Sequence, residues 1–170
     1  MKVPAETDFA AVLRLLVAAE VEFIVIGAVS AIAQGLVHTT EDVDVVYSRS
    51  AENIHRLTQA MAPFTPYLRG APPGLPFTFD ARTVRNGLNF TLTTILGSVD
   101  LLGEVSGGGT YEQLLPFTET RRAFGVEFRT VSLDKLIHLK RAAGRPKDFD
   151  LVARLEVLRQ ERIAAENAAE

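Results

Sequence analysis

Two aspartates in the stretch 42–47 are the residues whose types and spacing point most directly to chemistry. Asp42 and Asp44 alternate with β-branched residues, a pattern typical of a strand with one buried face. Residues two apart in a strand point to the same side, so the two carboxylates share one face while Val43 and Val45 share the other. Their Cα atoms would lie about 6–7 Å apart, where the charges repel unless a cation lies between them. Oxygen ligands of this kind suit Mg²⁺ or Mn²⁺, so the pair predicts a divalent-metal site.

A third carboxylate, Asp100, is the best candidate to complete such a site. It lies between Val99 and Leu101 on an otherwise apolar strand, just after the turn signal Gly97-Ser98. An isolated carboxylate in that setting needs a partner or water. The alternative interpretation is that the aspartate pair forms the exposed face of an edge strand and that Asp100 is a surface acid near a turn. The residue types alone leave both interpretations open.

Periodicity, capping residues and turn signals predict alternating helices and strands around these acids. The expected helices are 8–20, 28–35, one capped by Ser50, a short one at 111–115, one from Ser132 to about Ala143, and a last one that carries Leu151, Leu155 and Leu158. The expected strands are 23–26, 42–47, 88–96, 99–102, and a hairpin that turns at Gly125 and ends at Val131.

This order of elements predicts an α+β fold, with helices packed on a mixed or antiparallel twisted sheet and with C-terminal helices. A chain of 170 residues can bury one core but is short for two ordinary domains. We therefore expect a single domain over 1–170, with its core at about 8–158 and a helix end and frayed tail at 159–170. Five prolines predict an irregular surface loop at 62–76, which could form a lid, and Ser106 with three glycines predicts a flexible connection.

Composition limits the classes of function. The chain has no cysteine, which excludes disulfides, thiolate nucleophiles and cysteine-bound zinc, and which fits a reducing cytoplasm. The longest apolar run, 23–33, is about half of what a transmembrane helix needs, so no membrane partner is expected. The net charge of −3 argues against a broad nucleic-acid surface. However, 121–147 holds eight basic and two acidic residues, so this segment could bind a small polyanion or form a solvated face.

Three separated segments resemble the nucleotidyltransferase superfamily with the DNA polymerase β fold, in particular its small prokaryotic members of the minimal and abortive-infection type. The first runs from Ile26-Gly27-Ala28-Val29-Ser30 to Thr40-Glu41-Asp42-Val43-Asp44-Val45 and is similar to the family's apolar-Gly-Gly/Ser turn followed by Asp-X-Asp. The second, 94–102, looks like the strand that carries the third carboxylate. The third, 132–148, resembles the C-terminal helix and turn.

The resemblance implies roles for particular residues. Gly27 and Ser30 would let the chain approach the nucleotide phosphates, Thr40 would assist binding, and Lys140 would meet the triphosphate; Arg145, Lys147 and Asp148 are secondary candidates. Lys140 lies on the same helical stripe as Leu133, Leu136 and Ile137, and the alternative is that it extends to the surface. Asp42, Asp44 and Asp100 would be the catalytic carboxylates and would bind Mg²⁺ or Mn²⁺.

Two positions depart from the family pattern. Ala28 replaces the second Gly or Ser, and His38 replaces the Arg of the Arg-X-Thr-X-Asp-X-Asp version of the motif. His38 thereby removes a permanent cation from the phosphate region. The resemblance therefore predicts an enzyme that transfers NMP from an NTP to a hydroxyl of a small molecule, an RNA end or a protein. The alternative is a degenerate domain that acts as an antitoxin-like partner module; a homodimer or a toxin–antitoxin partner would fit either.

Overall fold

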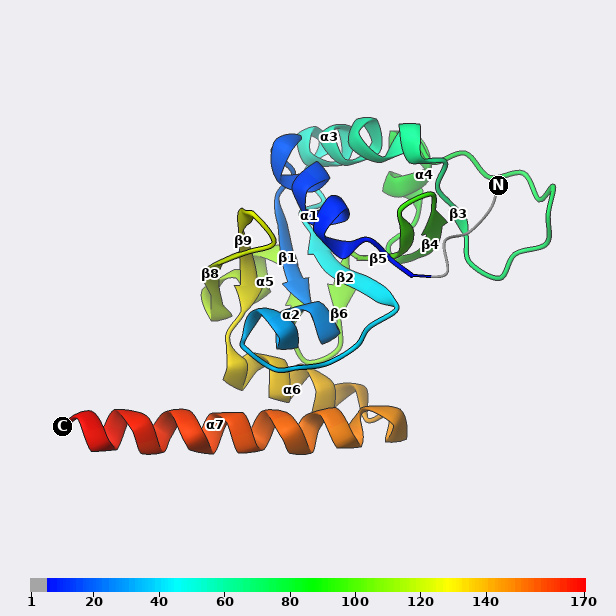
Figure 1. Ribbon diagram of the computed structural model, residues 1–170. Coiled ribbons are helices and arrows are strands. Elements are labelled where there is room, and N and C mark those ends of the chain that lie inside the picture. The colour runs from blue at the N-terminus through cyan, green and yellow to red at the C-terminus, as the bar shows by residue number, and fades with distance from the viewer. Residues whose placement is uncertain (1–5) are drawn as a thin grey trace.

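One mixed sheet of seven strands organises the computed structural model, which describes residues 6–170 (Figure 1). The helices are α1 Phe9–Ala18, α2 Gly27–Ala33, α3 Ala51–Met61, α4 Ala81–Asn86, α5 Tyr111–Leu114, α6 Leu133–Ala143 and α7 Phe149–Ala169. The strands of this sheet are β1 Phe23–Ile26, β2 Asp42–Tyr47, β3 Tyr67–Leu68, β4 Phe90–Thr94, β5 Gly97–Leu102, β8 Thr118–Ala123 and β9 Val126–Val131. A separate two-stranded ribbon pairs β6 Glu104–Val105 with β7 Gly109–Thr110.

The strand order is β3-β4-β5-β2-β1-β9-β8, so the predicted α+β fold with a mixed sheet is confirmed. β2 pairs antiparallel with β1 and parallel with β5, while β1 pairs parallel with β9. The antiparallel β4–β5 pair and the β8–β9 hairpin complete the sheet, as their turn signals predicted. The two strands that carry the candidate carboxylates, β2 and β5, are therefore neighbours in the centre of the sheet.

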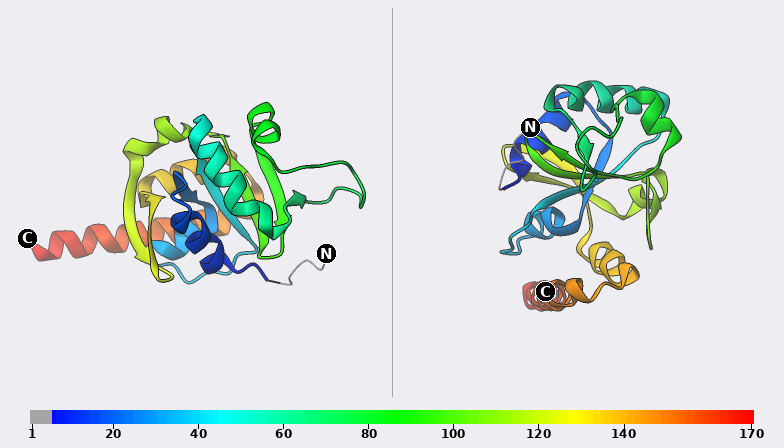
Figure 2. Two further views of the ribbon diagram at one scale, coloured as in Figure 1. Left: turned by 90° about the horizontal axis from the view of Figure 1, so that it is seen from above. Right: turned by 90° about the vertical axis from the view of Figure 1, so that its right-hand side faces the viewer.

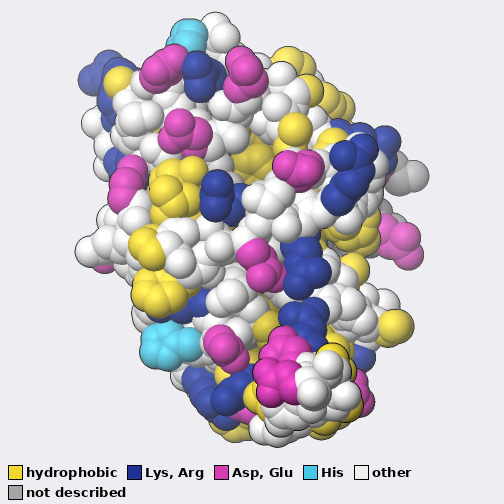
Figure 3. All heavy atoms as spheres, turned by 90° about the vertical axis from the view of Figure 1, so that its left-hand side faces the viewer, with side chains coloured by type: hydrophobic (Ala, Val, Ile, Leu, Met, Phe, Trp, Pro, Cys, Tyr) yellow, Lys and Arg dark blue, Asp and Glu magenta, His cyan; other side chains and the backbone are white. Residues whose placement is uncertain are grey.

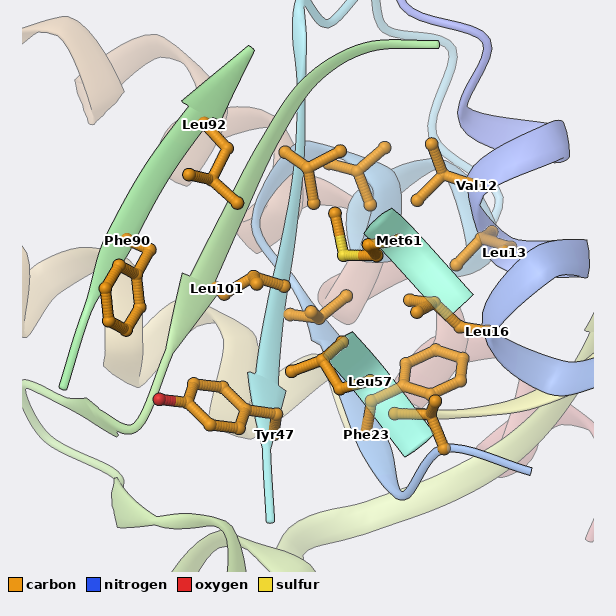
Figure 4. Close-up of a cluster of buried hydrophobic side chains, with 14 of the residues drawn as sticks. Val12, Leu13, Leu16, Phe23, Tyr47, Leu57, Met61, Phe90, Leu92 and Leu101 are labelled. Carbon is orange, nitrogen blue, oxygen red and sulfur yellow. The ribbon is translucent and has the colours of Figure 1, made fainter. Parts of the chain in front are cut away.

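Helices cover both faces of the sheet. Helices α1, α3 and α4 lie on one side, and α2, α6 and α7 lie on the other (Figure 2). The core on the α1/α3 side gathers Val12, Leu16, Tyr47 and Leu57 among other apolar side chains (Figure 4). The core on the opposite side contains Leu136 and Ile137 of α6 and Leu151 and Leu155 of α7 among its apolar side chains. Because strand residues alternate between faces, Val43 and Val45 belong to the first core and the aspartates of β2 face the α6 side.

Capping side chains begin the helices where the sequence predicts them. Asp8, Ser50 and Ser132 each accept a hydrogen bond from the backbone N–H three residues later, and these bonds satisfy first-turn donors. Gly144 ends α6 in the left-handed conformation, with φ of 63°. Within residues 6–170, none of the helices combines the length and apolar character that crossing a bilayer requires.

Four expectations from the sequence were incomplete or wrong. The segment 62–76 contains the edge strand β3, whose pairing with distant β4 has no local signal. Helix α4 was missed because its six residues show too little periodicity. The predicted flexible connection 106–109 forms the turn between β6 and β7 at 106–108, and Gly109 begins β7. The predicted frayed tail is helical to Ala169, since it consists mostly of good helix formers.

Candidate functional site

The register between β2 and β5 brings two of the predicted carboxylates together. Asp44 is directly opposite Asp100 in this parallel pair, and Asp42 is opposite Ser98. Asp42, Asp44 and Asp100 therefore share the face of the sheet that looks towards α6. This arrangement excludes the interpretation of Asp42 and Asp44 as an exposed edge, because β2 has a strand on each side.

Gly27 leaves the space that the Asp44 carboxylate occupies. A Cβ atom at Gly27 would lie 2.2 Å from Asp44 Oδ2, far inside the contact distance of the two atoms. Gly27 also has φ of 69°, a left-handed conformation that glycine adopts at little cost. β1 places the two residues together, since Ile26 is paired with Asp44 in the antiparallel β1–β2 ladder. Glycine is thus required here by both backbone conformation and the neighbouring carboxylate.

Burial and mutual repulsion raise the pKa values of the acids on β2. Burial, followed by the charge and hydrogen bonding of Asp100, raises the pKa of Asp44 from an ordinary value of 3.8 to about 7, although Lys140 opposes this shift. Burial also raises the pKa of Asp42, against the lowering effect of Arg69. Ionised Asp44 is therefore unfavourable without a cation. A divalent cation would relieve this cost, and the carboxylate oxygens are the ligands that Mg²⁺ and Mn²⁺ prefer.

A cation that the sequence analysis did not identify, Arg69, lies among the carboxylates. Its Nη2 donates to Asp100 Oδ1 at 2.7 Å and to the backbone oxygen of Leu92 at 2.8 Å. Its Nη1 lies 3.7 Å from Asp42 Oδ1. Within residues 6–170, no three acidic or histidine side chains are arranged closely enough to hold a metal ion as they stand. The Arg69 guanidinium contacts both Asp42 and Asp100.

The acids line a cleft of about 500 Å³ between the sheet and the C-terminal helices. Basic residues of α6 and the turn that follows line the same cleft; they are Lys140, Arg145 and Lys147. The Lys140 side chain is only 11% exposed, so it does not extend to the surface as the alternative proposed. The cleft thus combines carboxylates with cations, an arrangement suited to a metal-bound polyphosphate.

Asp148 holds two of these cations in place. Its Oδ1 lies 3.4 Å from Lys140 Nζ, and its Oδ2 accepts a hydrogen bond from Arg145 Nε at 2.7 Å. Burial raises the pKa of Asp148, but the hydrogen bond from Arg145 and the charges of Lys140 and Arg145 outweigh burial and lower it below its ordinary value. Asp148 is consequently ionised at neutral pH and positions the amino group and the guanidinium at the edge of the cleft.

The other residues predicted to bind the nucleotide differ in whether they line the cleft. Thr40 lines the cleft, and its hydroxyl donates to the backbone oxygen of Asp42 and accepts from the Asp42 N–H, which orders the start of β2. Ser30 does not line the cleft. It is fully buried, and its hydroxyl is 2.6 Å from that of Thr130, so the expected contact with phosphates disagrees with its location. The motif's second small position, Ala28, does line the cleft.

His38 lines the cleft with an arginine beside it. Arg154 on α7 donates from Nη1 to His38 Nδ1 at 2.9 Å and also donates to the backbone oxygen of Val37. An arginine side chain has no hydrogen-bond acceptor, so Nδ1 of His38 must accept this hydrogen bond. The permanent cation that the family motif has at position 38 is absent here, but the tertiary structure places another permanent cation next to this position.

The basic segment 121–147 divides between the cleft and a surface. Arg121 and Arg122 lie on β8, where Arg121 is bonded to Glu119 and Gln34. The end of the molecule that carries β8 and β9 shows basic and acidic side chains interspersed with white and apolar ones (Figure 3). The β8 arginines therefore form a solvated face, as the alternative interpretation proposed, whereas Lys140 of α6 and Arg145 and Lys147 after it line the cleft.

No protein-family model and no curated protein matches this sequence. Among solved structures, a crystal structure of a Thermotoga maritima protein described as a "putative nucleotidyltransferase" is similar to it. The two chains superpose with a TM-score of 0.51 over 92% of this chain and 94% of that one, at 15% sequence identity. At this identity the likeness defines the fold. The chain has a nucleotidyltransferase-like α+β fold, with the candidate carboxylates in its central strands.

Proposed function

We propose that this protein is a metal-dependent nucleotidyltransferase that transfers a nucleoside monophosphate from an NTP to a hydroxyl acceptor. The observation that carries the proposal is the meeting of Asp44 and Asp100 on adjacent parallel strands, in a cleft that Lys140 and Arg145 also line. The fold shared with the Thermotoga maritima protein supports it. Membership of the minimal or abortive-infection type and a protein partner stay predictions from the resemblance, and a cytoplasmic location stays a prediction from the composition.

In this proposal, the chain's own residues bind and orient the nucleotide. Lys140, Arg145 and Lys147 would pair with the phosphate oxygens, with Asp148 keeping the first two at the cleft. Asp42, Asp44 and Asp100 would hold Mg²⁺ or Mn²⁺, which when bound neutralises charge on the phosphates. Gly27 and Ala28 line the cleft wall, where their small size would let the nucleotide approach the main chain.

The reaction forms a bond between the acceptor oxygen and the α-phosphorus and breaks the bond from that phosphorus to the bridging oxygen. Pyrophosphate leaves with the electron pair of the broken bond, and the acceptor hydroxyl loses its proton. The resemblance to the nucleotidyltransferase superfamily implies that the third carboxylate helps to deprotonate the acceptor hydroxyl, so we assign this role to Asp100.

Incubation of the metal-free protein with Mn²⁺ and each α-labelled NTP tests the proposal. We expect NTP binding that requires the metal, followed by release of pyrophosphate when an acceptor is present. Binding of NTP in the presence of excess chelator, equal to that with Mn²⁺, would contradict metal-dependent transfer. A mixture of small hydroxyl compounds, RNA ends and proteins, resolved by the size of the labelled product, distinguishes the classes of acceptor.

Removal of the Lys140 amino group should weaken nucleotide binding. We expect Lys140→Ala to raise KM for the NTP by roughly 10- to 100-fold, the loss expected for charge-assisted hydrogen bonds to phosphate. Arg141→Gln is the matched control, since Arg141 lies next to it on α6 but is 59% exposed and paired with Glu156. Steady-state kinetics measure both variants, and an equal effect of the two would show that Lys140 has no specific role.

The second candidate function is a binding module that has the fold but no activity. Arg69 favours it, because a guanidinium already neutralises Asp42 and Asp100 in the arrangement described. This candidate predicts a stable protein partner on copurification, with no affinity for NTP in the presence of Mn²⁺. Metal-dependent NTP binding by the isolated chain would exclude it.

A further inference from the structure

Arg69 is held close to the carboxylates by its backbone. It directly follows the edge strand β3, and its N–H donates to the backbone oxygen of Thr91 at 2.9 Å. Thr91 is paired with Asp100 in the β4–β5 ladder. The main chain of Arg69 is therefore anchored beside Asp100, and only the side chain has to rotate for the guanidinium to leave the acids.

The Arg69 guanidinium neutralises the acids, but its hydrogen bonding at this position is incomplete. It makes one close contact with a carboxylate, to Asp100 at 2.7 Å, and lies 3.7 Å from Asp42. Within residues 6–170, Nε of Arg69 is the buried side-chain polar atom without a hydrogen-bond partner. A buried donor without an acceptor costs free energy that hydration would recover. The side chain is also 30% exposed, so water can reach the guanidinium.

A divalent cation and this guanidinium compete for the same oxygens. A metal ligated by Asp100 would lie about 2.0–2.1 Å from the carboxylate oxygen. Arg69 Nη2 is already 2.7 Å from Asp100 Oδ1, and two cations on one carboxylate in a partly buried site repel each other. Binding of a metal ion at Asp42 and Asp100 would therefore repel the Arg69 guanidinium from the position that it has in this structure.

We propose that Arg69 is an exchangeable internal cation of the carboxylate site. It neutralises Asp42 and Asp100 in the metal-free protein and leaves them when a divalent cation binds. This inference rests on the metal site of the proposed function and deepens it, because it makes Arg69 the residue that sets the metal concentration at which the site is loaded.

Titration of chelator-treated protein with Mn²⁺ at pH 8, with free Mn²⁺ measured by electron paramagnetic resonance, tests the exchange. We expect Arg69→Gln to bind Mn²⁺ about tenfold more tightly than the unmodified chain, since the competing charge is removed. Arg69→Lys should increase affinity only about threefold, because lysine keeps the charge and loses the planar fork. The control Arg82→Gln removes an exposed arginine of α4 and should leave Mn²⁺ affinity unchanged.

A thermal melt supplies a second measurement that does not depend on activity. We expect metal-free Arg69→Gln to melt at a lower temperature than the unmodified chain, because its acids then lack a counter-cation, and saturating Mn²⁺ should remove the difference. Mn²⁺ affinity that is equal to or weaker than that of the unmodified chain in both Arg69 variants overturns the exchange and leaves the metal site intact. An absence of Mn²⁺ binding in every variant, Arg82→Gln included, overturns the metal site and the exchange together.

Discussion

Asp44→Asn should abolish nucleotidyl transfer and at the same time stabilise the metal-free protein. We expect the rate of transfer with saturating NTP and Mn²⁺ to fall by roughly three orders of magnitude, as when a central catalytic carboxylate is removed. We expect the free energy of unfolding at pH 8 without metal to rise by roughly 1–3 kcal/mol, because the variant no longer buries a charge beside Asp100. Loss of activity together with a gain in stability is expected where a functional site lowers the stability of the fold.

The stability gain should depend on pH with a definite sign. In the folded chain the pKa of Asp44 is raised from 3.8 to about 7, so the folded state holds a proton that the unfolded state has released. The free energy of unfolding of the unmodified chain should therefore decrease as pH rises between about 4 and 7 and stay low above that range. Asp44→Asn lacks this group, so the two proteins should differ least near pH 4 and most above pH 7.

Urea titrations at pH 4.5 and pH 8 in the presence of chelator measure this difference. The control Asp134→Asn removes an acid of α6 whose side chain is 80% exposed and paired with Arg159. It should change stability by only about 0.5 kcal/mol or less at either pH, as surface ion pairs do. An Asp44→Asn protein that is less stable than the unmodified chain at pH 8 would contradict the assigned cause of the raised pKa.

Gly27→Ala should damage both the fold and the site. The new Cβ would lie 2.2 Å from Asp44 Oδ2 on a residue with φ of 69°, so the variant combines backbone strain with displacement of the carboxylate. We expect a loss of roughly 2–4 kcal/mol of unfolding free energy. We also expect transfer to slow by about 100-fold, the effect of moving a catalytic group by about 1 Å. Chemical denaturation and steady-state kinetics measure the two effects.

The control variant Gly125→Ala separates the effect of backbone strain from the effect of the contact with Asp44. Gly125, in the turn between β8 and β9, has φ of 78° and nothing within 4 Å of a Cβ at that position. We expect Gly125→Ala to lower the free energy of unfolding by only about 1–2 kcal/mol, from the left-handed backbone alone, and to leave the rate of transfer unchanged. In a background of Asp44→Ala, which removes the carboxylate but keeps a Cβ atom 3.2 Å away, the cost of Gly27→Ala should fall towards that of Gly125→Ala. If Gly27→Ala destabilises no more than Gly125→Ala in the unmodified chain, the close approach to Asp44 is not responsible.

Local patterns predicted the elements whose signals lie within a few residues of one another. The alternation in β2 placed Asp42 and Asp44 on one face, and the capping residues Asp8, Ser50 and Ser132 marked the starts of three helices. Short elements without periodicity, such as α4 and β3, escaped prediction because they are stabilised by contacts with distant segments. Ser30 shows a limit of motif reasoning, since its small side chain is used in the core with Thr130.

The sequence by itself determined the α+β class and the shared face of Asp42 and Asp44, because residue type and periods of two or 3.6 residues are local properties. Only the tertiary structure decided which charges meet. The parallel β2–β5 register brings Asp44 to Asp100, and the pairing of β3 with β4 brings Arg69 to Asp42 and Asp100. The physical reason is that strand register depends on contacts over the whole sheet, and the raised pKa of Asp44 arises from burial and charges that such contacts create.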